Sequence, residues 1–64
     1  MKLTREDLAM MLNKMNIHNA DYVDVDVHVE NTCDGIILDS IAFHAIKIVD
    51  KRKFFVTNLL TIKE

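Results

Sequence analysis

The sequence lacks several features on which whole classes of protein depend. Its 64 residues contain no proline, no tryptophan and one glycine, Gly35. The single cysteine, Cys33, can form no internal disulfide and cannot complete a zinc pair. Apolar runs such as Ile36–Leu38 and Ile41–Phe43 are far shorter than the roughly 20 residues that span a bilayer. These absences favour a reducing, cytoplasmic setting without a membrane partner.

Size and charge limit the chain further. Half of its residues are apolar, 28% are charged and the net charge is −2, which indicates one small globular domain, 1–64. A domain of this size buries only about 60% of the surface of its unfolded chain, so its stability is marginal without a disulfide, a metal or a partner. We therefore expect a homo-oligomer. The mild acidity argues against a general attraction to nucleic-acid phosphate.

The first part of the chain predicts an amphipathic helix over residues 4–16. Thr4 and Asp7 have the spacing of a capping box, and Asn19 suits the left-handed end of a helix. An apolar stripe at helical spacing is formed by Leu8, Met11, Leu12 and Met15.

From Tyr22 onward the hydrophobic period changes from that of a helix to two, the period of a strand. In the segment 22–30 valines alternate with polar residues, which predicts a strand with one wet face. The alternation changes parity near Asp39–Ser40 or Ala45, which predicts a bend or bulge, and the charged turn 50–53 precedes two short apolar segments, 54–56 and 59–62. The predicted fold class is α+β: an N-terminal helix followed by about five short antiparallel strands that form a strongly bent sheet or small barrel.

This order of elements resembles the Sm-like family, in particular its bacterial Hfq-type RNA-binding members. The segments that carry the resemblance are Met11–Asn13, Asn19–Val23, Gly35 with Ile37, Ser40–Ile46 and Phe55–Ile62. The resemblance implies a small bent barrel that self-associates through strand edges and binds single-stranded RNA. It also implies that His44 stacks on a base and that Thr57 and Asn58 bond a base edge. Thr57–Asn58 replaces the basic Lys-His pair of the family, and the acidic residue of its bend is absent at Ile41 and Ala42.

Each candidate residue for RNA binding also has a simpler interpretation. His44 is equally the solvent-facing residue of an alternating strand, and Thr57–Asn58 is equally a turn. The basic cluster of Lys51, Arg52 and Lys53 can contact phosphate, or it is a solvated hairpin turn.

Two further groups of residues suggest contacts with protein. Asp24, Asp26 and Glu30 share one strand face, which is either solvated or the surface of a small protein-interaction module or inhibitor. Same-face residues about 7 Å apart diverge too far to chelate one ion, so no metal site is expected. The segment Phe54, Phe55 and Val56 is the edge predicted to join a neighbouring copy. The three histidines lie in different predicted elements and no nucleophile motif accompanies them, so we expect neither an enzyme nor a cofactor.

Overall fold

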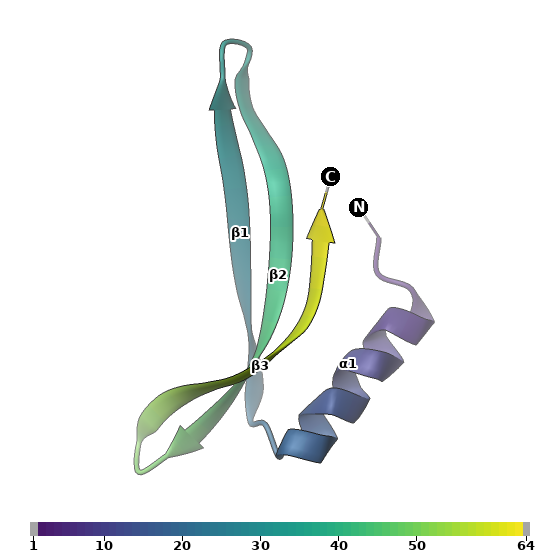
Figure 1. Cartoon of the computed structure of the whole chain (residues 1–64), viewed down its shortest axis with the longest axis vertical. Helices are drawn as coiled ribbons and strands as arrows, with labels where there is room; N and C mark the ends of the chain where they lie inside the picture. Colours follow the sequence, from purple (N-terminus) through teal and green to yellow (C-terminus); the bar gives the residue numbers. More distant parts are fainter. Residues whose placement is uncertain (1, 64) are drawn as a thin grey trace.

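The computed structural model describes residues 2–63 as one helix and three long strands (Figure 1). Helix α1 spans Arg5–His18, and strands β1, β2 and β3 span Tyr22–Thr32, Gly35–Val49 and Arg52–Lys63. The strands pair antiparallel in the order β1-β2-β3, so strands that follow one another in the chain are also neighbours in the open sheet. The predicted α+β class is confirmed.

Local side-chain chemistry sets both ends of α1. The Asp7 backbone N–H donates to Thr4 Oγ1 over 3.1 Å, and the Thr4 N–H donates to Asp7 Oδ2 over 3.0 Å, which completes the predicted capping box. Asn19 ends the helix in the left-handed conformation, with φ of 52°. The helix therefore begins and ends close to its predicted limits.

The prediction of about five short strands closing into a small barrel is wrong. The ladders are continuous and contain bulges, which leave one extra residue at Asp39 of β2 and at Val56 and Leu59 of β3. A bulge reverses the side-chain alternation and bends the strand without ending it. The bend or bulge expected near Asp39–Ser40 is thus confirmed. Thr57–Asn58, which was expected to separate two strands, lies inside β3.

Two tight turns connect the strands. Asp50 and Lys51, with φ of 52° and 66°, form the two-residue loop between β2 and β3, as in a type I′ turn. Gly35 closes the β1–β2 turn with φ of 123°, and Thr32 Oγ1 donates to its carbonyl over 2.8 Å. Because type I′ turns follow the twist of the strands, the Asp50–Lys51 loop suits a strongly twisted sheet.

The core lies where α1 meets β3. Met11, Ala45 and Leu59 are buried together, and half-buried apolar side chains such as Met15 and Val56 pack around them. Lys14 Nζ donates to the Leu59 carbonyl over 3.3 Å, which adds a hydrogen bond between α1 and β3. The bulge at Leu59 brings two consecutive leucines, Leu59 and Leu60, to this core.

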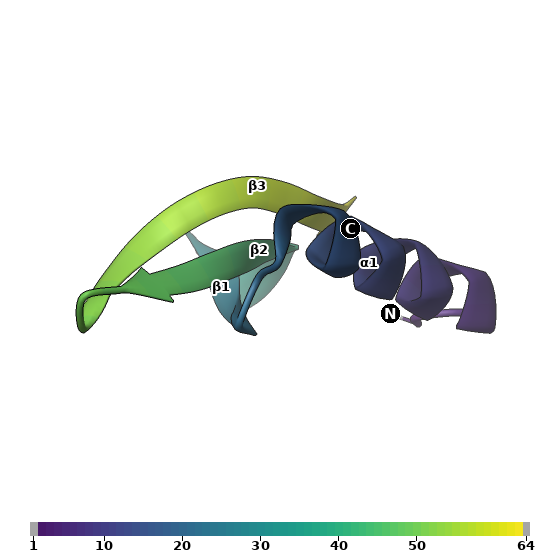
Figure 2. The same ribbon diagram turned by 90° about the horizontal axis from the view of Figure 1, so that it is seen from below.

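The molecule is flat. Its Cα extents are 44 × 29 × 11 Å, because α1 lies beside β3 instead of stacking over the sheet (Figure 2). Among residues 2–63 no helix has the length and apolar character needed to cross a membrane.

Candidate protein-interaction surface

The register of the strands gives β1 two chemically different sides. Residues that pair across antiparallel strands point to the same side of the sheet, and neighbours along a strand point to opposite sides. Val25 pairs with Phe43, whereas Asp26 pairs with Ala42 and Asp24 with His44. The valines of β1 therefore lie on one side and its acidic residues on the other.

We call the apolar side the Val face. Its β1 row is Val23, Val25, Val27 and Val29. The paired row on β2 is Ala45, Phe43, Ile41 and Leu38, and Leu60 and Ile62 extend it onto β3.

The helix covers only one end of the Val face. Val23, Phe43 and Leu60 pack against the core beneath α1. Farther along β1, the side chains of Val25, Val27 and Val29 are 54%, 56% and 56% exposed. Most of the β1 row thus remains open to solvent, although a one-sided antiparallel sheet normally packs its apolar side against a second layer.

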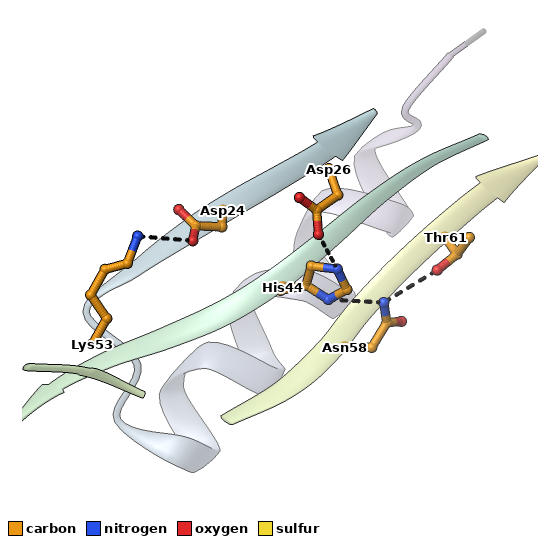
Figure 3. A network of polar contacts seen from close by, with 6 residues as sticks. All are labelled: Asp24, Asp26, His44, Lys53, Asn58 and Thr61. Atoms are coloured by element: carbon orange, nitrogen blue, oxygen red, sulfur yellow. Dashed lines mark hydrogen bonds and ion pairs between the residues drawn. The ribbon is translucent and has the colours of Figure 1, made fainter. Parts of the chain in front are cut away.

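The opposite side, which we call the polar face, carries a chain of hydrogen bonds centred on His44 (Figure 3). His44 Nε2 lies 3.0 Å from Asp26 Oδ2. The Asn58 amide nitrogen donates to His44 Nδ1 over 3.3 Å and lies 3.2 Å from Thr61 Oγ1. The Phe55 ring meets the imidazole edge-on, with centroids 5.3 Å apart. Both ring nitrogens of His44 therefore have partners within the chain, and its ring contacts Phe55.

A second contact on the polar face joins a predicted acidic residue to a predicted basic one. Lys53 Nζ lies 3.5 Å from Asp24 Oδ2 and 6.0 Å from the centre of the Tyr22 ring. The Asp24 carboxylate, and then Tyr22, raise the pKa of Lys53 above its ordinary value. One residue from each of the two groups that the sequence assigned to separate functions thus lies beside the other, with opposite charge.

The other candidate residues are dispersed. Lys51 and Arg52 are exposed at the β2–β3 turn, and Glu30 is exposed near the far end of β1. Thr57 pairs with Ala45 and not with His44, so it does not join Asn58 beside the imidazole.

The segment Phe54, Phe55 and Val56 does not form one apolar surface. Phe54 pairs with Lys47 and Phe55 with Ile46, so the two exposed rings point to opposite sides of the sheet. Val56 is the extra residue of a bulge and packs against the core.

In the part of the chain that the structure describes, no three His, Cys, Asp or Glu side chains gather as metal ligands, and no pocket is found. Comparison of the chain with protein-family models, curated proteins and solved structures gives no match. The exposed faces of the sheet are therefore the features that bear on function.

The sequence predicted the alternation of β1 and one wet face, but it did not predict that the valine side would also be exposed. A quantitative signal could have identified this exposure. A chain that is half apolar and has one helix among its described residues has little with which to cover the apolar side of a long sheet.

Proposed function

We propose that this chain is a non-catalytic protein-interaction module that acts by docking its Val face on another protein surface. The observation that carries the proposal is the row formed by Val25, Val27 and Val29, each more than half exposed on an otherwise apolar sheet face. Contiguous exposed apolar patches on small proteins mark interaction sites.

Burial of the Val face supplies a favourable contribution to binding. Full burial of one valine contributes roughly 1.5–3 kcal/mol, so covering three half-exposed valines contributes about 2–4 kcal/mol. The aliphatic and aromatic side chains of β2 and β3 on the same side add to this sum. The sheet supplies a rigid platform, so little conformational entropy is lost when a partner docks.

The polar face is the weaker candidate for a binding site. Two of its three predicted acidic residues already have internal partners, since Asp24 contacts Lys53 and Asp26 contacts His44. A phosphate that approached Lys53 or His44 would also approach these carboxylates, which repel it. These contacts favour neither single-stranded RNA nor an acidic-face inhibitor, and both functions stay predictions from the sequence.

Site-specific photocross-linking in living cells tests the proposal. A short diazirine amino acid replaces Val27 in the full chain, and a matched variant carries it at His28, the next residue on the opposite side of β1. We expect a discrete adduct of defined mass from the Val27 probe and little or none from the His28 probe. Equal yields from both positions, or no adduct at Val27, would contradict a docking role for the Val face.

A further inference from the structure

We infer that the partner covering the Val face is a second copy of this chain, packed face to face as the other layer of a β-sandwich. This inference rests on the proposed function, because it names the partner for the same surface. It follows from three observations: the accessible area, the shape of the chain and the chemistry of the face.

The accessible area supports an interface of the size that a stable dimer needs. A folded monomer of this mass is expected to expose about 4200 Å². The chain exposes 5080 Å². The excess of about 900 Å² over that expectation is close to the roughly 800 Å² that each partner buries in a standard interface.

The shape shows which layer is missing. Stable domains pack at least two layers around a core, and sheets that stack lie about 10 Å apart. This chain is only 11 Å deep in Cα positions, and its radius of gyration is 14.0 Å. A compact domain of this length would have a radius of gyration of about 11 Å. A second sheet over the Val face would supply the absent layer.

The chemistry of the face is compatible with a copy of itself. Within the described residues, the strand pairs from Val23–Ala45 to Val29–Leu38 on the Val face contain no ionisable side chain. A two-fold interface brings the same patch of both chains together, so a charge there would meet its own like charge. Across these four strand pairs nothing of this kind opposes pairing, and the side of β1 that carries Asp24 and Asp26 would point outward to water.

The chain also needs a partner that is always present. Among residues 2–63 only five apolar residues are buried: Met11, Ala42, Ala45, Ile46 and Leu59. Obligate homodimers have the more apolar interfaces and often lack a stable folded monomer. A second copy is present wherever the chain is made. A copy of the chain is therefore favoured over a partner that is present only at times.

Sedimentation equilibrium of the purified full chain at micromolar concentration tests the inference. We expect twice the 7.4 kDa chain mass. Val27→Lys places a charge in the interface, and Ile37→Lys is the matched control. Ile37 pairs with Glu30 on the polar face and is 51% exposed, close to the 56% of Val27. We expect Val27→Lys to abolish the dimer and Ile37→Lys to leave it intact.

Thermal unfolding of the unsubstituted chain tests the inference even if Val27→Lys does not fold. A dimer that unfolds to separate chains has a midpoint that rises by about 5 °C for each tenfold increase in protein concentration, whereas the midpoint of a monomer is constant. A folded monomer with a constant midpoint would overturn the inference, and so would a dimer that Val27→Lys leaves intact. If the Val27 cross-link then joins a different protein, the proposed function stands and only the choice of partner fails.

Discussion

His44 Nε2 and Asp26 Oδ2 lie 3.0 Å apart across the central ladder of the sheet, and the other ring nitrogen of His44 accepts from Asn58. On the same face, two residues before Asp26 in β1, Asp24 forms a second ion pair with Lys53. The polar face thus contains side-chain pairs, whereas no side-chain ion pair joins the described residues of the Val face.

The His44 contacts predict the tautomer of the neutral imidazole. An amide nitrogen can only donate, so the bond from Asn58 requires Nδ1 to be the acceptor and places the ring proton on Nε2, where it is donated to Asp26. Long-range 1H–15N correlation spectra should show the Nε2–H form of His44. The exposed His28, for which no such pair exists among the described contacts, serves as the reference for a mixed population. A dominant Nδ1–H form of His44 would contradict the network.

The Asp24–Lys53 pair predicts a specific change in ionisation. Asp24→Asn removes the largest cause of the raised pKa of Lys53, so this pKa should fall toward its ordinary value. Asp26→Asn is the control and should leave the pKa of Lys53 unchanged, because Asp26 contacts His44 instead. An NMR titration of the Lys53 side chain measures both variants.

The direction of the Lys53 shift fixes the pH at which the pair stabilises the fold. The pKa of Lys53 is raised in the folded chain, so the pair contributes stability below the ordinary lysine pKa and loses it as the pH rises through the raised value. Unfolding of wild type and Asp24→Asn should therefore differ at neutral pH and converge at strongly alkaline pH. A difference that persists there would assign the effect to packing.

Truncation of the central leucine should destabilise the whole chain. Leu59 of β3 is 1% exposed and belongs to the same buried cluster as Met11 of α1. Leu59→Ala therefore removes buried methyl groups and leaves a cavity. The expected cost is roughly 2–5 kcal/mol, a large part of the stability of a small domain. Urea unfolding measures it. Ile48→Ala, at an exposed position of β2, is the control and should cost much less.

The β2–β3 turn offers a stabilising substitution. Lys51 holds a left-handed conformation, with φ of 66°, which is strained for a residue with a β-carbon by roughly 1–2 kcal/mol. Lys51→Gly relieves this strain but adds roughly 0.5–1 kcal/mol of backbone entropy to the unfolded chain. We expect a net gain of about 0.5 kcal/mol, seen as a higher thermal midpoint. The control Lys53→Gly lies in the strand and should lower the midpoint.

The sequence predicted those features whose causes are local. The capping box of Thr4 and Asp7, the left-handed Asn19 and the alternation of β1 each depend on residues within a few positions of one another. For this reason the helix and the first strand lie close to where the pattern indicated. The bulge at Asp39 also had a local sign, since the alternation changes parity there.

The number of strands and the polar pairs depend on register, which is not local. Two polar residues between apolar segments are equally consistent with a break between strands and with one bulged strand, so β3 was predicted as two short strands divided at Thr57–Asn58, although Val56 and Leu59 are bulges within one. Likewise, the contact between Asp24 and Lys53 requires the pairing of both hairpins. The spacing of residues 29 apart in the sequence contains no information about it.

The docking of α1 on β3 sets the order in which the chain can fold. Each hairpin joins neighbouring segments and can form as soon as its second strand is available. The helix is made first, yet its contact surface includes Leu59, near the end of the chain. During synthesis Met11 and Met15 therefore cannot pack against Leu59 until β3 has left the ribosome. A chain cut before Leu59 would for the same reason lack the surface on which the helix docks.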